Sequence, residues 1–226
     1  FYSTPSVKKA LNVSGTSQNI PEKKRELPED LVNKLRSGGY TIFVRHATRH
    51  KWANLGAYDR LPLFDNTRKD LSPFKSGVCL NEQGIHESKI MGMAYGKLQI
   101  PVGKIYSSPI CRAIETAKFA FGRVDYLSTG FALHSVFNGA KEKSRSKEEG
   151  RRLFLLKPEK GKNDFIFSHT SVVQNLDFEA PSGIQEAGAY IFEHISDEEV
   201  KHLATVTLKG LVDAIPTETY TVPYKN

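Results

Sequence analysis

The sequence predicts an α/β protein, a three-layer α/β/α sandwich with a mainly parallel central sheet. Short apolar stretches alternate with helix-like segments along most of the chain, which is the order expected for a parallel sheet covered on both faces. Two of the apolar stretches, at residues 40–44 and 165–167, lead into a histidine two positions later. With 39% hydrophobic and 25% charged residues, the composition is that of a globular domain.

The first predicted helix begins near Pro28 and ends at Gly38, with Leu31, Val32 and Leu35 recurring at helical spacing. The later elements follow the same alternation. Strands are expected at residues 40–44, 103–107, 131–137, 164–168, 187–195 and 200–208, and helices at 81–99, 108–122, 146–158 and 209–215. Side chains with a specific expected place are Ser108 as an N-cap, Pro109 as a first helical residue, and Ile85, Ile90, Met93 and Leu98 on a buried helix face.

Residues 1–26 are polar, rich in Pro and Ser and without periodicity, so we expect an extended N-terminal tail. Residues 27–226 contain no repeat and no sign of a second domain, and a single domain is expected there. The chain starts at Phe1 instead of Met, which we interpret as removal of a preceding segment. On this ground, an exported or periplasmic location is preferred over a cytoplasmic one.

Composition narrows the possible partners. The net charge of +7 is spread along the chain and is compatible with an anionic ligand. No run approaches the roughly 18 apolar residues of a membrane span. The basic run at 141–157 also carries acids and lacks interleaved aromatics, so we expect a solvated helix face and no nucleic-acid contact.

The two cysteines, Cys79 and Cys111, are expected to be buried thiols, with one disulfide as the alternative.

Basic side chains gather where the first predicted strand ends. Arg45 and Arg49 flank His46, and two guanidiniums beside an imidazole form a cradle for phosphate or carboxylate oxygens. Their charges would lower the pKa of His46 and keep it neutral and nucleophilic. The alternative is that one arginine caps a carbonyl group while the other points to solvent. His46 and His50 have the spacing of a helical metal pair, but a strand end is a poor place for one.

Two distant residues extend this cluster. Arg112 falls in the first turn of a predicted helix, where the macrodipole disfavours a cation by about 0.3–1 kcal/mol unless an anion is bound. Pairing with Glu115 is the alternative. His169 follows an apolar strand, and the carboxyl ends of parallel strands lie at one edge of a sheet. His169 and His46 are therefore expected on the same rim, although a structural core histidine is the alternative for His169.

Three motifs in this order resemble the histidine phosphatase superfamily, the phosphoglycerate-mutase-like proteins. "FVRHATR" is similar to the Arg-His-Gly signature, in a small bacterial-type variant with the pattern Arg-His-Ala-x-Arg. "YSSPICRAIETA" is similar to the "SSPxxRxxxTA" block, and "FIFSHTSVV" to the block of the second histidine. The resemblance covers residues 40–173 and implies a phosphoglycerate-mutase-like fold.

The resemblance also implies roles for individual residues. His46 resembles the nucleophile that becomes phosphohistidine, and His169 the second histidine that donates to the same phosphoryl group. Arg45, Arg49 and Arg112 resemble the arginines that hold the phosphoryl oxygens. The implied enzyme is a phosphoric monoester hydrolase that acts on a small phosphorylated substrate and requires neither a metal nor another cofactor.

The general acid is the one point of departure from the family pattern. Thr170 stands where some branches of the family have an Asp after the second histidine. Other members use a Glu elsewhere, and we prefer Glu186 because it precedes a late strand that could reach the same rim. The alternatives, in a charged run, are Glu142, Glu148 and Glu149.

The leading functional hypothesis is hydrolysis of a phosphomonoester. A phosphomutase of the same family and a catalytically inactive protein that binds a phosphorylated ligand are the alternatives. The loop from about residue 50 to residue 80 is expected to cover the pocket. Its aromatic and basic side chains suggest a polar organic phosphate; they are Trp52, Tyr58, Arg60 and Arg68. No oligomeric state is predicted.

Overall fold

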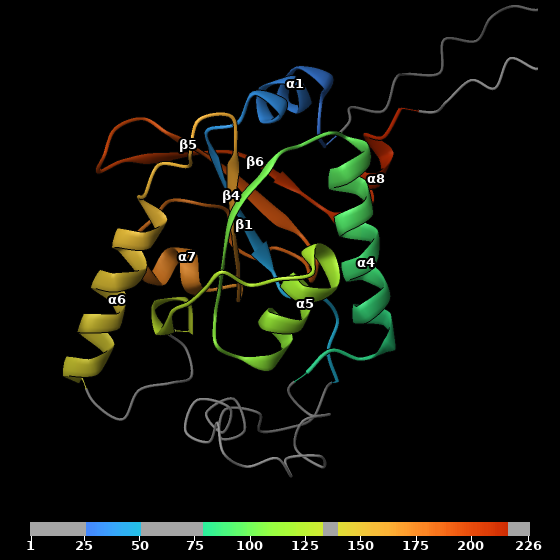
Figure 1. The fold of residues 1–226 in the computed structure, drawn as a ribbon. Helices are drawn as coiled ribbons and strands as arrows, with labels where there is room; N and C mark the ends of the chain where they lie inside the picture. The colour runs from blue at the N-terminus through green and yellow to red at the C-terminus, as the bar shows by residue number, and fades with distance from the viewer. Residues whose placement is uncertain (1–25, 51–78, 133–139, 217–226) are drawn as a thin grey trace, which may run out of the picture.

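A computed structural model describes residues 26–50, 79–132 and 140–216 (Figure 1). The helices are α1 (Glu29–Ser37), α4 (Glu82–Lys97), α5 (Cys111–Phe121), α6 (Ala140–Phe154), α7 (Val172–Asn175) and α8 (Leu208–Asp213), with a 3-10 helix η2 at Thr129–Ala132. The strands are β1 (Tyr40–Arg45), β2 (Val102–Ser107), β3 (Tyr126–Leu127), β4 (Asn163–Ser168), β5 (Ala189–His194) and β6 (Val200–Val206).

The strands form one six-stranded sheet in the order β3-β2-β4-β1-β5-β6. The first four strands in this order pair in parallel, while β5 and β6 run antiparallel to their neighbours. Consecutive strands β1 and β2 are separated in the sheet by β4, which is inserted between them. The carboxyl ends of β1, β4 and β2 therefore lie side by side, and β5 begins at that same edge.

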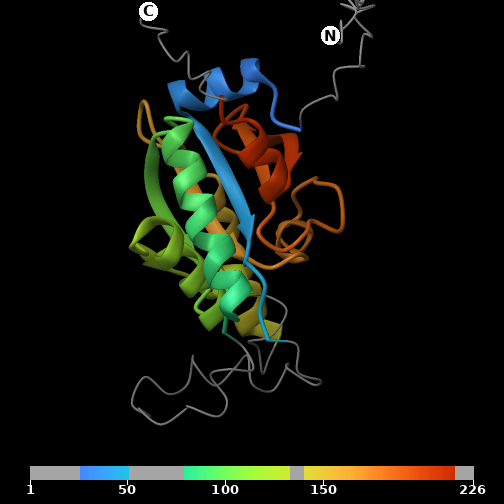
Figure 2. The ribbon, with the colours of Figure 1, turned by 90° about the vertical axis from the view of Figure 1, so that its right-hand side faces the viewer.

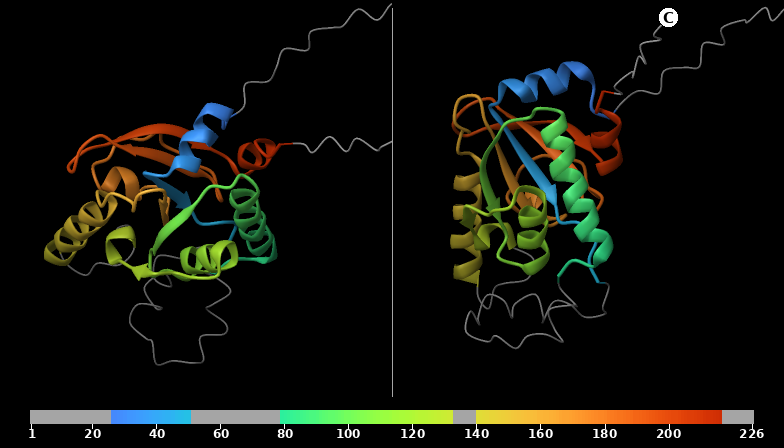
Figure 3. Two further views of the ribbon diagram at one scale, coloured as in Figure 1. Left: turned by 45° about the horizontal axis from the view of Figure 1, so that its top comes forward. Right: turned by 45° about the vertical axis from the view of Figure 1, so that its right-hand side comes forward.

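Helices cover both faces of the sheet. Alternate residues of β1 point to opposite sides, because Ile42 and Val44 belong to the core beneath α1, α4, α5 and α8, whereas Phe43 belongs to the core beneath α6 and α7. Figure 2 views the molecule from the side of α4, and Figure 3 shows α6 on the opposite side of the sheet. The predicted α/β class with a mainly parallel sheet between helical layers is confirmed.

Most predicted elements are present, but several details of the prediction are wrong. The helix α5 begins at Cys111 with Ile110 as N-cap, so Ser108 and Pro109 precede it. The reason is that the Ser108 N–H donates to the Phe167 carbonyl and continues the β2–β4 ladder. Met93 is 48% exposed, because the buried face of α4 is formed instead by Gly84, Ser88, Met91, Ala94 and Tyr95.

Two further expectations concern the segment around η2 and α6. Phe131 and Ala132, expected in a strand, lie in η2 and are buried there. The rest of that expected strand lies outside the described residues. The same holds for the loop at residues 51–78, with its predicted substrate-selecting side chains, and for nearly all of the predicted tail. The helix α6 spans Ala140–Phe154 instead of residues 146–158.

No helix in the described part of the chain is long and apolar enough to cross a membrane.

The turn between α1 and β1 requires a glycine at residue 38. Gly38 has φ +76° and ψ −179°, a conformation that side-chain-bearing residues almost never adopt. A Cβ added there would lie 2.4 Å from the backbone carbonyl carbon of Gly161 and the backbone nitrogen of Lys162. Both atoms belong to the turn that precedes β4, so neither can move aside like a flexible side chain.

We predict that Gly38→Ala lowers the free energy of unfolding by about 2–4 kcal/mol, because it adds a steric clash to the backbone strain. Gly122→Ala is the matched control. Gly122 also has φ +76°, but no atom lies within 4 Å of its added Cβ, so about 1–2 kcal/mol is expected. Urea denaturation of both variants tests this, and equal losses would contradict the proposed backbone clash.

Candidate active site

The predicted site residues meet at the carboxyl edge of the parallel strands. The N–H of His46, just after β1, donates to the Ser168 carbonyl at the end of β4 (3.0 Å). Ser108, just after β2, donates in the same way to Phe167 (2.9 Å). The residues that follow neighbouring strands are thus held by continued backbone pairing, and His46, Ser108 and His169 are all buried there.

The imidazole of His46 is fixed in one orientation. Its Nδ1 lies 2.8 Å from the carbonyl oxygen of Ala47. A carbonyl can only accept, so Nδ1 carries a proton, and in the neutral ring Nε2 then keeps its lone pair. Burial holds the pKa of His46 well below its ordinary value, and the positive charges of Arg112, Arg45 and Arg49 add to this effect, while the hydrogen bond to Ala47 opposes it. His46 is therefore neutral near pH 7, with Nε2 available as a nucleophile.

His169 lies beside His46, and the two ring centroids are 5.3 Å apart. The Nε2 atom of His169 forms a 3.0 Å hydrogen bond with Oγ of Ser108. The preceding residue is also anchored, since Oγ of Ser168 donates to the Phe131 carbonyl (2.7 Å). The two histidines therefore lie on one rim of the sheet, at the ends of the neighbouring strands β1 and β4.

The guanidinium of Arg45 joins β1 to the segment before β5. Its Nη1 donates to the Ile184 carbonyl (2.7 Å), and its Nη2 lies 3.4 Å from Oε1 of Glu186. The backbone of this segment pairs with the end of β1, because the Ala187 N–H donates to the His46 carbonyl (3.1 Å). Ala187 has φ +59°, an uncommon conformation for a residue with a side chain. The turn places Glu186 next to Arg45 at the rim.

Arg112 is the second residue of α5 and is 4% exposed. Its backbone is tied to the loop that carries His46 through Thr116. The Thr116 hydroxyl donates to the Arg112 carbonyl (2.7 Å) and accepts from the Ala47 N–H (3.0 Å). Because Arg112 contributes to lowering the pKa of His46, its positive charge acts at this rim.

Arg49 continues the same loop and is half-buried. It pairs with Leu80 as an antiparallel bridge, and its Nη1 donates to the His50 carbonyl (2.9 Å). The preceding residue, Thr48, is held by Glu87 of α4, whose carboxylate accepts from the Thr48 N–H and hydroxyl at 2.9 and 3.0 Å. Arg49 is therefore held by its backbone near His46, whose pKa its charge helps to lower.

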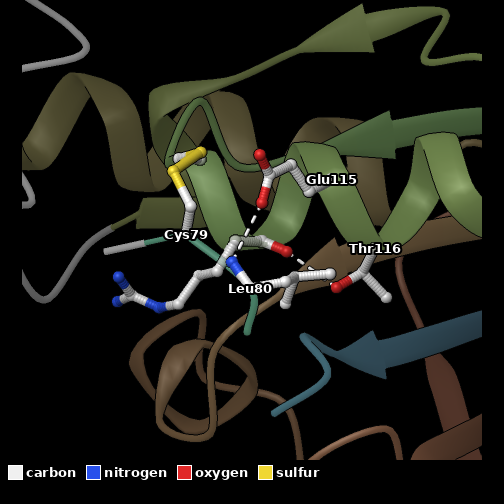
Figure 4. The surroundings of a disulfide bond; sticks show 6 residues. Cys79, Leu80, Glu115 and Thr116 are labelled. Carbon is white, nitrogen blue, oxygen red and sulfur yellow. Dashed lines mark hydrogen bonds between the residues drawn. A yellow bond between two sulfur atoms is a disulfide. The ribbon is translucent and has the colours of Figure 1, made fainter. Parts of the chain in front are cut away.

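The expectation of free thiols is wrong, because Cys79 and Cys111 form a disulfide with a Cα–Cα distance of 5.0 Å. Figure 4 shows Cys79 and Leu80 beside α5, with the Glu115 carboxylate accepting from the Leu80 N–H (2.9 Å). Pairing of Leu80 with Arg49 places Cys79 against the start of α5, which a separation of 32 residues does not indicate by itself. Within the described residues, Cys79, Cys111 and Glu115 are also the one group with metal-ligand spacing, but both sulfurs are bonded.

The candidate general acids fall in two places. Glu186 contacts Arg45 directly. Glu142, Glu148 and Glu149 lie exposed on α6, where Glu142 and Glu149 line a surface hollow with Thr129, Arg145 and Ser146. Of these carboxylates, only that of Glu186 has a described contact with a predicted phosphate-binding residue.

The sequence prediction missed two residues that support the site. Ser108 was assigned to a helix cap, yet it bonds to His169, and Thr116 was given no role, yet it links Ala47 to α5. Both belong to the "SSPICRAIETA" segment. The available signal was their place in the motif block, since spacing alone does not show which strand a hydroxyl will face.

No family model and no curated protein matches the chain. Among solved structures, it is similar to the putative phosphohistidine phosphatase SixA from Agrobacterium tumefaciens, with 17% identity and a TM-score of 0.44, over 75% of this chain and 98% of that one. A phosphoserine phosphatase from Entamoeba histolytica has 15% identity and a TM-score of 0.47, over 76% of this chain and 98% of that one. A third protein, TTHB049 from Thermus thermophilus, has 19% identity and a TM-score of 0.45, over 74% of this chain and 99% of that one.

Two of these three proteins are named as phosphatases. Identities and TM-scores of this size assign no role to a residue of this chain. The roles proposed below are therefore based on the geometry at the rim.

We predict that His46 makes folding stability depend on pH. Since its pKa is lower in the folded protein, the unfolded chain binds a proton below about pH 6.5 that the folded protein does not. The free energy of unfolding should then fall on acidification below about pH 6.5, by at most about 1.4 kcal/mol per pH unit from this group. Denaturant unfolding of the parent and of His46→Asn measures the difference, and parallel pH profiles would exclude a depressed pKa at His46.

Proposed function

We propose that this protein is a phosphatase that hydrolyses a phosphomonoester through a phosphohistidine intermediate on His46. In the first step, Nε2 of His46 attacks phosphorus, the N–P bond forms and the P–O bond to the leaving group breaks. In the second step, water attacks phosphorus and the N–P bond breaks. Its electron pair returns to Nε2, and orthophosphate leaves.

The observation that carries this proposal is the state of His46. The side chain is buried, its Nδ1 donates to Ala47, and its pKa is lowered by that burial and by the same arginine charges that would attract a phosphoryl group. Burial and the arginine charges favour a neutral imidazole, and the hydrogen bond to Ala47 places the proton of that neutral ring on Nδ1, which leaves the lone pair at Nε2. A histidine serving only as packing would not need three cationic side chains acting on its ring.

The remaining groups supply charge and hydrogen bonds. Arg45, Arg49 and Arg112 carry the positive charge that a transferring phosphoryl group requires, so the proposed reaction proceeds without a metal ion. His169, 5.3 Å from His46 between ring centroids, is proposed to donate to the same phosphoryl oxygens. Its bond to Ser108 keeps the ring oriented toward the rim.

Glu186 is proposed as the general acid. In the first step its carboxyl group protonates the leaving oxygen, and in the second the resulting carboxylate accepts the proton of the attacking water. Its position next to Arg45 supports this role, because Arg45 directly precedes the nucleophile in the chain and would hold the same phosphoryl group. Without an Asp after His169, no alternative carboxylate is supplied by the second histidine motif.

We predict that His46→Ala lowers kcat for p-nitrophenyl phosphate by roughly 10⁴-fold or more, because no other residue replaces the nucleophile. The assay is run in EDTA to test metal independence. His50→Ala is the matched control and should retain parent activity, since His50 is a half-buried histidine four positions away with no proposed role.

Acid-labile phosphate trapped on the parent, and absent from His46→Ala, would identify the intermediate. Sustained hydrolysis by His46→Ala would refute the proposed mechanism. A parent that binds orthophosphate without any hydrolysis would instead indicate a phospho-ligand binding protein. Transfer of the phosphoryl group to a second position of the substrate would indicate a mutase.

We predict that the effect of Glu186→Gln depends on the leaving group. Alkyl phosphates need protonation of the leaving oxygen, so their kcat/KM should fall by roughly 10²-fold or more. p-Nitrophenolate leaves without a proton, and its loss should stay below roughly 10-fold. Glutamine preserves an oxygen acceptor for Arg45, which keeps the local geometry comparable.

Glu142→Gln on α6 is the control for this experiment. It removes one of the alternative carboxylates and should leave both substrates unaffected. A leaving-group dependence in Glu142→Gln, together with equal losses for both substrates in Glu186→Gln, would transfer the acid role away from Glu186.

A further inference from the structure

The disulfide joins two segments that both carry proposed phosphate-binding residues. Cys111 is the first residue of α5 and directly precedes Arg112. Cys79 directly precedes Leu80, whose backbone pairs with Arg49. The disulfide thus connects the segment that pairs with Arg49 to the helix turn that contains Arg112.

On the α5 side, the link continues to the nucleophile. Cys111 and Glu115 are one turn apart, and the Glu115 carboxylate accepts from the Leu80 N–H at 2.9 Å. One residue further, Thr116 joins the Arg112 carbonyl to the Ala47 N–H. Covalent and hydrogen bonds therefore hold the first turn of α5 against both residue 80 and the His46 loop.

On the other side, residues 79–81 hold the end of that loop. The Asn81 N–H donates to the Thr48 carbonyl (3.2 Å), next to the pairing of Leu80 with Arg49. Gly84 lies close enough to Thr48 that an added Cβ would be 1.9 Å from the Thr48 carbonyl oxygen. Thr48 and Arg49 thus depend on the position of the segment that Cys79 begins.

We propose that the Cys79–Cys111 disulfide is a positioning element of the phosphate site, and that its reduction weakens binding of a phosphoryl anion. The inference rests on the proposed function only in that it names phosphate as the anion held by Arg49 and Arg112. It adds that the site is fully formed in the oxidised protein, so full activity requires an oxidising compartment.

The fold does not need the bond in the same way. Neither cysteine belongs to the two hydrophobic clusters that flank the sheet, whereas Ala113 and Ala117 anchor α5 in one of them and Leu80 belongs to the same cluster. Breaking the disulfide should therefore loosen the first turn of α5 and the pairing at Leu80 while the sheet and its helices stay folded.

The reductant we consider is a dithiol such as dithiothreitol. One of its thiolates attacks a sulfur of the disulfide, giving a mixed disulfide and releasing the other cysteine as a thiolate that takes up a proton. The second thiol of the reagent then displaces the bound cysteine. The two protein thiols are formed, and the reagent is oxidised to its cyclic disulfide.

The test compares orthophosphate binding by the oxidised and the reduced protein, using calorimetry and product inhibition. We predict that reduction raises the Kd of orthophosphate and the KM of p-nitrophenyl phosphate by roughly 10-fold or more, since displacement of a charged group by about 1 Å has effects of this size. The circular dichroism signal of the folded protein should stay unchanged at the assay temperature.

The double variant Cys79→Ser with Cys111→Ser is the matched control. It should bind orthophosphate as weakly as the reduced parent and show no further response to dithiothreitol. Equal Kd values for the oxidised and reduced parent would overturn the positioning role, and so would loss of the folded circular dichroism signal on reduction, which would assign the bond to the fold. Free thiols in the parent isolated under oxidising conditions would also overturn it.

Failure of the proposed function gives a different result. An oxidised parent that binds orthophosphate in a disulfide-dependent way but hydrolyses no phosphomonoester would refute the phosphatase and support the positioning role. If hydrolysis and orthophosphate binding both persist unchanged on reduction, the result would support the phosphatase and refute the positioning role.

Discussion

Burial of His46 within a group of positive charges is the constraint on which the proposed site depends. Desolvation and three arginines oppose protonation of the ring, while its bond to Ala47 fixes the proton on Nδ1. Removing one arginine would relieve the repulsion but would also remove a donor for the anion. An anion would stabilise the cluster, so the arginine charges that favour anion binding also add to burial in keeping the proposed nucleophile neutral.

The sheet topology turns this local cluster into a site. Insertion of β4 between β1 and β2 places the residues after three parallel strands at one edge, and backbone bonds continue past the strand ends to His46 and Ser108. The antiparallel strand β5 starts at this edge and delivers Glu186 from the other side of β1. Segments far apart in the chain therefore supply adjacent side chains, as the contacts of Ser108 with His169 and of Arg45 with Glu186 illustrate.

In the loops at this edge, short polar links supplement the hydrophobic core. Thr116, Glu115 and Glu87 each accept from a backbone N–H of the segments around Ala47, Leu80 and Thr48. The disulfide adds a covalent link in the same region. Ala47 and Leu80 also belong to the hydrophobic core, and the hydrogen bonds and the disulfide add to its hold on these loops. Because the rest of the core does not depend on these links, the proposed phosphate site is expected to respond to reduction when the fold does not.

By itself, the sequence determined the alternation of strands and helices, the basic cluster at the end of β1 and the two histidines that follow apolar strands. These features are local, because periodicity and side-chain type express them within a few residues. Only the tertiary structure decided that Cys79 reaches Cys111, that Ser108 bonds to His169 instead of capping a helix, and that Glu186 lies against Arg45. Each of these contacts depends on strand order and register, which bring together residues whose separation along the chain carries no information about distance.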